Sequence, residues 1–343
     1  MPVNVAILGV GSLVGQGVIK SLRMSTLETK LIGLDFFPSA VGLHWTDSSY
    51  LLPDILDPAV SDEEYIQRLV EILIHERADV LLPVLDFDVV RMAESRARIE
   101  AESGCKVVVS SSEVARIGDD KWETYQFLKD NGLPYPRSLI DLDGLNAFVE
   151  EVGFPLIVKP RHGARSNGVS LVREASGLPA AIQAAGSEPI VQEAIGTSDE
   201  EYTCGAVVLD GECIGTIALR RDLRDGGTAR AYLSPYESVE ALVRRAAVAL
   251  QPVGSVNFQL RLGPDGPTIF EINSRFSGTT YLRAMAGFNE VDAIIRWAAL
   301  GERVALAQNR YGVILRYPEE IFVEWDAYNR LATPGQSQDT ATS

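Results

Sequence analysis

Residues 3–109 alternate short apolar runs with segments of helical periodicity, and this alternation restricts the fold more than any other feature of the sequence. Strands that alternate with helices in this way form a parallel sheet with helices on both faces. We therefore expect an α/β domain that ends near residue 112. The predicted strands fall at residues 3–9, 31–35, 79–84 and 106–109, and the predicted helices at residues 15–24, 62–75 and 88–102.

The composition limits the protein class. With 343 residues, of which 46% are hydrophobic, the chain is long enough for two or three domains. Its formal net charge of −16 argues against nonspecific binding to nucleic acid or to an anionic membrane. No apolar run reaches the roughly 18 residues of a membrane span, and the first residues lack the basic start of a signal peptide. Three widely spaced cysteines indicate reduced core thiols, so we expect a cytoplasmic protein.

From residue 113 onward the pattern changes to strand pairs joined by tight turns. Asp210-Gly211 and Asp265-Gly266 each separate two strand-like runs, and an Asp-Gly pair in this position is a strong hairpin signal. Hairpins combined with helices predict an α+β architecture for this part of the chain. The predicted divisions are residues 1–112, 113–188 and 189–331, followed by a polar, turn-rich tail at residues 332–343 that we expect to be disordered.

Glu271 and Asn273 alternate with apolar residues on a predicted strand. Residues two apart in a strand point to the same face, so these side chains present oxygen atoms side by side. Gln259 lies on the preceding strand of the same hairpin, where cross-strand neighbours can share a face. Such oxygen donors suit a magnesium ion that carries phosphates. Arg275 follows directly, and its planar guanidinium can make two contacts to an oxyanion.

Lys159 ends an apolar strand and precedes a loop at residues 160–168 that contains glycines and basic side chains. The backbone N–H groups of such a loop can approach phosphate oxygens, and nearby cations neutralise the phosphate charge. Taken alone, the pattern also fits a strand-end lysine whose ammonium group reaches water beside an ordinary loop. The sequence therefore predicts a phosphate site at this loop, and the alternative of an ordinary strand-end lysine stays open.

Lys159 with its loop, Gln259, Glu271, Asn273 and Arg275 together resemble the ATP-grasp superfamily, in its carbamoyl-phosphate-synthase-like and amino-acid-ligase-like branch of carboxylate–amine ligases. The resemblance extends over nearly the whole chain. It implies a Rossmann-like N-terminal domain without a nicotinamide cofactor, followed by a two-subdomain ATP-grasp fold. It also implies ATP with Mg²⁺, or Mn²⁺ in its place, small carboxylate and amine substrates such as amino acids, and a homodimer.

The resemblance assigns roles to individual residues. Those implied to contact the nucleotide and its phosphates are Lys121, Lys159, Arg161, Gly163, Ser166 and Gly168. Those implied to contact adenine are Gln192, Glu193 and Ile195, with Glu201 on the ribose and Glu200 as its competitor. The implied metal ligands are Gln259, Glu271 and Asn273, where glutamine at 259 replaces the glutamate often found in the family. The implied catalytic residues are Arg275 and Arg220, with Arg221 and Arg230 as alternatives to Arg220.

The implied reaction is ADP-forming ligation of a carboxylate to an amine through an acylphosphate, and three alternatives stay open. One is a different ATP-grasp chemistry, either carboxylation through carboxyphosphate or a kinase reaction. Another is a noncatalytic nucleotide-binding regulator. The third is an NAD(P)-dependent oxidoreductase, because Gly9-Val-Gly-Ser-Leu-Val-Gly15 with Asp35 is similar to a dinucleotide fingerprint, although its last glycine comes one position late.

Overall fold

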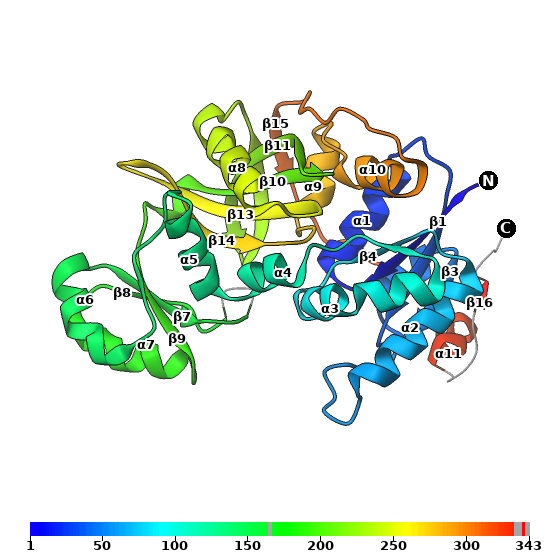
Figure 1. Cartoon of the computed structure of the whole chain (residues 1–343), viewed down its shortest axis with the longest axis horizontal. Coiled ribbons are helices and arrows are strands. Elements are labelled where there is room, and N and C mark those ends of the chain that lie inside the picture. Colours follow the sequence, from blue (N-terminus) through cyan, green and yellow to red (C-terminus); the bar gives the residue numbers. More distant parts are fainter. Residues whose placement is uncertain (164–166, 333–337, 340–343) are drawn as a thin grey trace.

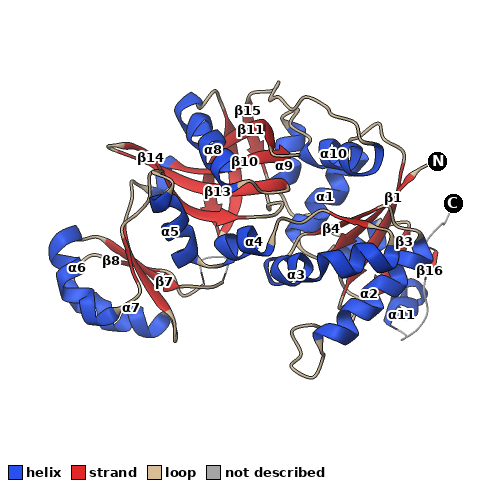
Figure 2. Cartoon of the chain, viewed as in Figure 1, coloured by secondary structure: helices blue, strands red, loops and turns tan. Residues whose placement is uncertain are grey.

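The computed structural model describes residues 1–163, 167–332 and 338–339, which form three β-sheets surrounded by helices (Figures 1 and 2). Sheet A belongs to the N-terminal part of the chain, sheet B is a small sheet at the opposite end of the molecule, and sheet C lies between them. The mixed architecture, with a parallel sheet followed by antiparallel ones, confirms the predicted fold class.

Sheet A has the strand order β16-β3-β2-β1-β4-β5. The strands β1 to β5 run parallel to one another, and β16 is antiparallel to β3. The parallel strands are β1 (Val3–Leu8), β2 (Thr29–Asp35), β3 (Ser48–Leu51), β4 (Val80–Pro83) and β5 (Lys106–Val107). The helices that cover it are α1 (Leu13–Arg23), α2 (Asp62–Glu76) and α3 (Asp86–Ser103).

Side-chain alternation along β1 builds the two faces of sheet A. Val5 and Ile7 belong to the core that includes α1, whereas Ala6 and Leu8 belong to the core that includes α2 and α3. The core on the α1 face continues into sheet C, because Ile217 is part of the same buried cluster. The N-terminal domain and sheet C are therefore joined by shared apolar packing.

Sheet B is antiparallel, with the order β6-β9-β7-β8. Its strands are β6 (Ser138–Leu139), β7 (Leu156–Pro160), β8 (Ser170–Val172) and β9 (Pro189–Glu193), and its helices are α6 (Leu145–Val152) and α7 (Leu178–Ala184). Phe148, Val158 and Leu178 belong to a buried cluster that contains residues of this unit alone. Sheet B thus has a small core of its own.

Sheet C is antiparallel, with the order β14-β13-β10-β11-β12-β15. Its strands are β10 (Glu201–Leu209), β11 (Glu212–Arg224), β12 (Gly227–Leu233), β13 (Gly254–Gly263), β14 (Gly266–Asn273) and β15 (Gly312–Leu315). The helix α8 (Glu237–Leu250) packs on one face. The helices α9 (Thr280–Met285) and α10 (Glu290–Ile295) contribute to the core that sheet C shares with α1.

Two helices that precede sheet B in sequence pack on sheet C in space. These are α4 (Ser112–Asp119) and α5 (Lys121–Asp130), and Val114 and Leu128 are buried in the same cluster as Phe258 of β13. Conversely, β9 lies inside sheet B although it follows the predicted division at residue 189. The spatial units therefore interleave along the chain, and the predicted domain boundaries stay predictions.

The C-terminal segment returns to the N-terminal domain. The helix α11 (Trp325–Ala332) ends at the start of the tail predicted to be disordered, and Gln338–Asp339 form β16, which pairs antiparallel with β3. An added edge strand such as β16 needs only backbone partners, which a polar composition does not reveal, and the disorder of the tail stays a prediction. Residues 333–337 and 340–343 lie outside the described part.

Among the described residues, no helix is long and apolar enough to cross a membrane. All three cysteines are buried free thiols, as expected from their apolar sequence surroundings.

Candidate active site

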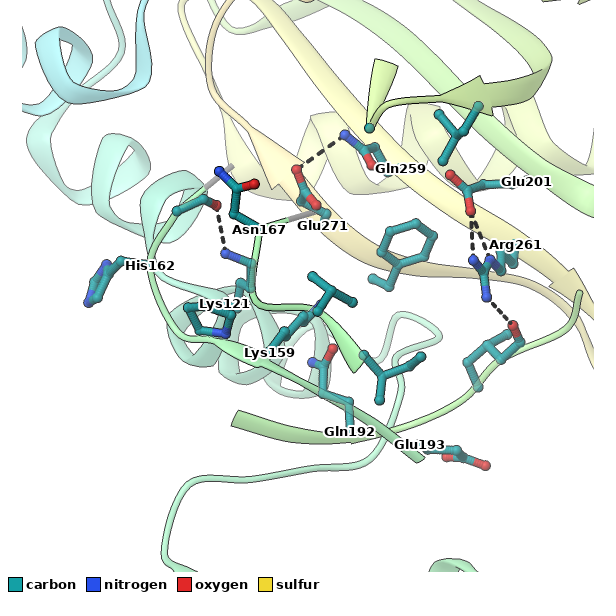
Figure 3. A pocket seen from close by; sticks show the side chains of 18 of the residues that line it. Lys121, Lys159, His162, Asn167, Gln192, Glu193, Glu201, Gln259, Arg261 and Glu271 are labelled. Carbon is teal, nitrogen blue, oxygen red and sulfur yellow. Dashed lines mark hydrogen bonds and ion pairs between the residues drawn. The ribbon is translucent and has the colours of Figure 1, made fainter. Parts of the chain in front are cut away.

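A cavity lies between sheets B and C and encloses about 930 Å³, part of it open to solvent (Figure 3). Sheet B contributes side chains of β7 and β9, sheet C contributes side chains of β10, β11, β13 and β14, and α5 begins at its edge. We call this the first cavity. Of the residues predicted to contact a nucleotide or its metal, it is lined by Lys121, Lys159, Gly163, Gln192, Glu193, Ile195, Glu201, Gln259 and Glu271.

Lys159 is a buried cation on the sheet B side of the first cavity. It is 6% exposed and its ammonium nitrogen lies 5.7 Å from the centre of the Phe270 ring. Burial lowers the pKa of Lys159 to about 8, while the nearby carboxylate of Glu271 acts in the opposite direction. A lysine held in this environment is poised to gain a negatively charged partner.

Lys121, the first residue of α5, reaches the loop that follows Lys159. Its Nζ donates to the backbone carbonyls of Gly163 at 3.0 Å and Arg161 at 3.3 Å (Figure 3). The loop backbone is thereby held next to a second cation at the cavity edge.

Two of the predicted phosphate-loop residues that the structure describes, Arg161 and Gly168, do not line the first cavity. Arg161 instead forms an ion pair with Asp120, at 2.6 Å between Nη2 and Oδ2, because Asp120 is the N-cap of α5 and lies beside the loop. Gly168 adopts a positive φ of 71° next to Pro160, which is a turn role. Ser166 falls outside the described residues. The prediction of direct nucleotide contact therefore lacks support at Arg161 and Gly168.

The β9 side of the first cavity carries the residues predicted to contact adenine. Gln192 is buried, and its Nε2 donates to Ser138 Oγ at 2.8 Å. Glu193 pairs with Arg137 at 3.1 Å, and Ile195 lies at the end of the same segment. These residues form a mixed apolar and polar wall on β9 and the residues just after it.

Glu201 lines the first cavity, whereas its competitor Glu200 does not. The carboxylate of Glu201 is 3% exposed, and each of its oxygens accepts from an arginine. Arg221 Nη2 donates to Oε1 at 2.7 Å and Arg261 Nη2 donates to Oε2 at 2.8 Å. A buried carboxylate with two cationic partners is firmly held in place.

The predicted metal ligands meet on one face of the hairpin β13–β14. Gln259 lies directly opposite Glu271, and a β-bulge follows between Gln259 and Leu260. Glu271 Oε1 accepts from Gln259 Nε2 at 3.1 Å and from Asn273 Nδ2 at 3.0 Å. Because the bulge adds one residue to β14, the consecutive side chains Phe270 and Glu271 both line the cavity.

These three side chains fit a magnesium ion that shares its ligands with phosphates. Glu271 supplies a carboxylate, and Gln259 and Asn273 supply amide oxygens, which are the hard donors that Mg²⁺ prefers. The described residues contain no cluster of three histidine, cysteine or acidic side chains that could hold a metal by themselves. One carboxylate and two amide oxygens suit a metal ion whose remaining ligands come from a nucleotide.

Arg275 leaves this strand toward the N-terminal domain. Its Nη2 donates to Asp86 Oδ2 at 2.7 Å and to Asn273 Oδ1 at 3.2 Å. Asp86 begins α3 just after β4, so this ion pair ties the metal-ligand strand to the N-terminal domain.

Of Arg220, predicted to reach the reacting group, and its alternative Arg221, only Arg221 lines the first cavity. Arg221 Nη2 donates to Gln259 Oε1 at 2.7 Å. Arg220 faces away, with its guanidinium 4.1 Å from the Tyr232 ring centre and Nη1 bonded to the carbonyl of Asp199. Neighbouring residues of a strand point to opposite faces, so only one of the two can face the cavity. Arg230, the other alternative, pairs with Asp222.

A second cavity adjoins the first and lies between sheet C and the N-terminal domain. It encloses about 2130 Å³, part of it open to solvent, and it shares Lys121, Gly163, Arg221, Gln259 and Glu271 with the first cavity. A compound in the second cavity would therefore meet a nucleotide in the first at the Glu271 cluster.

In the N-terminal domain, side chains of the protein itself occupy the space beside the glycine-rich turn. Asp35 is 3% exposed and its Oδ2 accepts from Gly11 N at 2.7 Å. A side chain at Gly11 would meet Phe37 and Ala40, which leaves no free space beside this turn. Asp35 is thus unavailable to a ribose, and the motif gives no support to the oxidoreductase alternative.

Comparison with known proteins shows what the region around this site is similar to. Residues 118–279 match the family described as an ATP-grasp domain. D-alanine–D-alanine ligase from Mycobacterium sp. (strain KMS) is 29% identical over 252 residues, covering 65% of this chain and 65% of the ligase. The chain thus spans just under two thirds of the length of these curated relatives. The carbamoyl phosphate synthase large chain of Methanothermobacter thermautotrophicus is 25% identical over 320 residues, covering 86% of this chain and 29% of that protein.

Solved structures share the fold at low sequence identity. N5-carboxyaminoimidazole synthetase from Staphylococcus aureus complexed with ADP has a TM-score of 0.71 and 13% identity, covering 92% of this chain and 81% of that chain. Biotin carboxylase from Campylobacter jejuni, complexed with an ATP compound, has a TM-score of 0.70 and 17% identity, covering 90% of this chain and 74% of that chain. The similarity extends through the N-terminal domain and both sheets that enclose the first cavity.

Proposed function

We propose that this chain, whose residues 118–279 match the ATP-grasp domain family, is an ATP-dependent ligase that joins a small carboxylate to an amine and releases ADP and phosphate. The observation that carries the proposal is the position of Lys159 and the Glu271 cluster in one cavity. A buried cation and a set of hard oxygen donors are the complementary partners of a magnesium-bound polyphosphate.

The first cavity suits a nucleotide with its adenine near β9 and its phosphates near Lys159. Gln192, Glu193 and Ile195 offer hydrogen-bonding groups and an apolar contact at one end. Lys121 and Lys159 supply positive charge to the same cavity. Glu201 lies within the cavity and is the better candidate for the ribose, although two arginines already engage its oxygens.

Glu271, Asn273 and Gln259 would hold the magnesium ion. When bound, Mg²⁺ neutralises phosphate charge and orients the phosphates for transfer. Arg221 and Arg275 contact this cluster from its two sides, through Gln259 and Asn273 respectively. Their guanidinium groups are placed to stabilise the negative charge of the transferred phosphoryl group.

The reaction follows from these groups without a side-chain nucleophile. A carboxylate oxygen of the substrate attacks the γ-phosphorus of ATP, and the bond between that phosphorus and the β–γ bridging oxygen breaks, giving an acylphosphate and ADP. The amine then attacks the acyl carbon, inorganic phosphate leaves, and the nitrogen loses a proton. Holding the reactants in adjoining cavities favours both steps by proximity.

The test is magnesium-dependent release of ADP and phosphate from ATP with pooled amino acids and small carboxylates, read together with mass spectrometry of the products. We expect ADP together with a product lighter than its two precursors by one water. ADP formation that depends on bicarbonate would instead identify a carboxylase, and a phosphorylated product that persists would identify a kinase. A homodimer and a cytoplasmic location stay predictions.

A further inference from the structure

The second cavity has two chemically different walls. Sheet C and the residues that follow β14 and β15 contribute positively charged and small polar side chains, including Arg275, Ser277 and Arg316. The starts of α1 and α3 in the N-terminal domain contribute large apolar side chains, including Leu13 and Phe87. A ligand that fills this cavity meets both walls.

Arg316 is a cation of the second cavity whose guanidinium has N–H donors left for a ligand. It follows β15, and its backbone N–H donates to the carbonyl of Ala229, which fixes it beside β12. Its side chain donates to the backbone carbonyl of Gly278, and no carboxylate of the described residues lies within ion-pair distance. Burial is the sole cause that lowers the pKa of Arg316. A guanidinium carries five N–H donors, so most of its donors are left for a ligand.

The other cations of this cavity are already engaged. Arg275 forms its ion pair with Asp86, and Arg221 forms its ion pair with Glu201. Lys121 donates to backbone carbonyls of the loop after β7. A partly buried guanidinium without a negatively charged partner is costly, and an anionic ligand removes that cost.

The apolar wall lies next to Arg316. Leu13, at the start of α1, approaches Gly278 so closely that a side chain added at that glycine would lie 3.4 Å from Leu13 Cδ2. Gly278 is also the residue whose carbonyl accepts from Arg316. Leu13 is 45% exposed and Phe87 is 37% exposed, although both are large apolar side chains at a cavity. One ligand can therefore contact the cation and the apolar surface together.

We propose that the second cavity binds a small carboxylate with an apolar side chain, whose carboxylate pairs with Arg316 while its side chain contacts Leu13 and Phe87. This deepens the proposed function, on which it rests, by naming a substrate class. Arg316 fixes the anionic end of the substrate, and Leu13 and Phe87 set the preference for an apolar group.

The test is calorimetric titration of the full chain, with Mg²⁺ and ADP present, using leucine, phenylalanine and 4-methylpentanoate as probes. We expect at least one of these acids to bind, and its Kd to rise at least about tenfold in Arg316→Gln, since a hydrogen bond to a charged group is lost. Leucinamide, which lacks the carboxylate, should bind the wild type as weakly as leucine binds this variant. Arg310→Gln is the matched control, because Arg310 also donates to a backbone carbonyl but lies outside the cavity.

The apolar wall is tested by Leu13→Asn, with Leu300→Asn as a control of nearly the same exposure outside the cavity. We expect Leu13→Asn to weaken leucine binding at least severalfold while Leu300→Asn leaves it unchanged. The proposal is overturned if none of the three acids binds the wild type, or if leucine and leucinamide bind equally. The comparison of acid and amide needs no variant, so misfolding of Arg316→Gln cannot obscure the result. ADP binding in the same samples reports on the proposed function separately.

Discussion

The hairpins β10–β11 and β13–β14 carry similar sequence signals, and each contains one β-bulge, but the bulges have different consequences for prediction. In β13–β14, Gln259 lies directly opposite Glu271, so the predicted metal ligands share a face. In β10–β11, the register shift between Val207 and Val208 places Tyr202 opposite Arg220. A shift of one residue changes which side chains face the cavity.

The hairpin β10–β11 shows how such a shift determines which residue faces the cavity. Next to its turn, Leu209 pairs with Glu212, and an unbroken register from there would set Glu201 opposite Arg220. After the bulge the partner of Glu201 is Arg221, as their 2.7 Å ion pair confirms. Turn chemistry predicts where a hairpin lies, but the face of a distant residue depends on every bulge in between.

The largest effect should come from Glu271 on β14. We expect Glu271→Ala to lower the rate of ADP formation by about 10³-fold, because charge stabilisation at the phosphates is lost. Glu212→Ala, on the exposed end of the other hairpin, is the control and should retain activity. The measurements are a coupled ADP assay and thermal unfolding, in which both variants should unfold cooperatively. Near-normal turnover of Glu271→Ala would falsify the metal assignment.

The next effect separates the neighbouring arginines of β11. We expect Arg221→Ala to lower kcat/KM by about 10²-fold, because Arg221 contacts both Gln259 and Glu201. Arg220→Ala should stay within about threefold of the wild type, since Arg220 faces Tyr232. Steady-state kinetics of both variants gives the two kcat/KM values to be compared. A larger loss in Arg220→Ala than in Arg221→Ala would mean that the assigned register is wrong.

The pH dependence of nucleotide affinity should report on Lys159. Its pKa of about 8 in the free protein lies below the ordinary value, and bound phosphates favour its charged form. ATP affinity should therefore be full below pH 8 and fall by up to about tenfold per pH unit above it. Fluorescence titration from pH 6.5 to 9.5 measures this profile.

A variant of Glu271 links this profile to the hairpin β13–β14. Because Glu271 raises the pKa of Lys159 against the effect of burial, Glu271→Gln should move the midpoint to lower pH. Arg220→Ala, on the other hairpin, should leave the midpoint unchanged. A flat profile in the wild type would show that the Lys159 ammonium group does not assist binding.

The smallest effect should follow from adding charge at Gln259. Gln259→Glu gives the metal a second carboxylate, so we expect half-maximal activity at a Mg²⁺ concentration several-fold lower. Without Mg²⁺ the variant should be less stable by about 1 kcal/mol, because the new carboxylate faces Glu271 directly across the hairpin. Activity and unfolding measured against Mg²⁺ concentration test both parts, with Gln308→Glu, at a half-buried position outside both cavities, as the control. An unchanged Mg²⁺ requirement would argue against a metal role for position 259.

Local patterns predicted the core of the candidate site. Glu271 and Asn273 lie two residues apart on one strand, and Lys159 ends a buried strand, so each could be placed from its immediate neighbours. Arg161 looked equally suitable in its loop, but Asp120, 41 residues earlier, pairs with it. Competition from a distant carboxylate cannot be read from a loop sequence.

The arrangement of the units depended on long-range packing. The alternation of strands and helices predicted β1, β2, β4 and β5 of sheet A, which follow a local periodicity, but it did not predict β3 or β16. The packing of α4 and α5 on sheet C was not predictable, because their apolar side chains would suit either neighbouring unit. Arg316 was also overlooked, since it follows an edge strand with no motif around it. Its signal is a lack of charged partners, which becomes visible only in three dimensions.

The separate core of sheet B has a mechanical consequence. Phe148, Val158 and Leu178 pack only within that unit, so sheet B can pivot as a rigid body without exposing the core of sheet C. Lys159 and Gln192 would travel with it, while Glu271 stays behind. The grip on a bound nucleotide could then be loosened and restored at little energetic cost, and the adenine end and the phosphate end would be released in one movement.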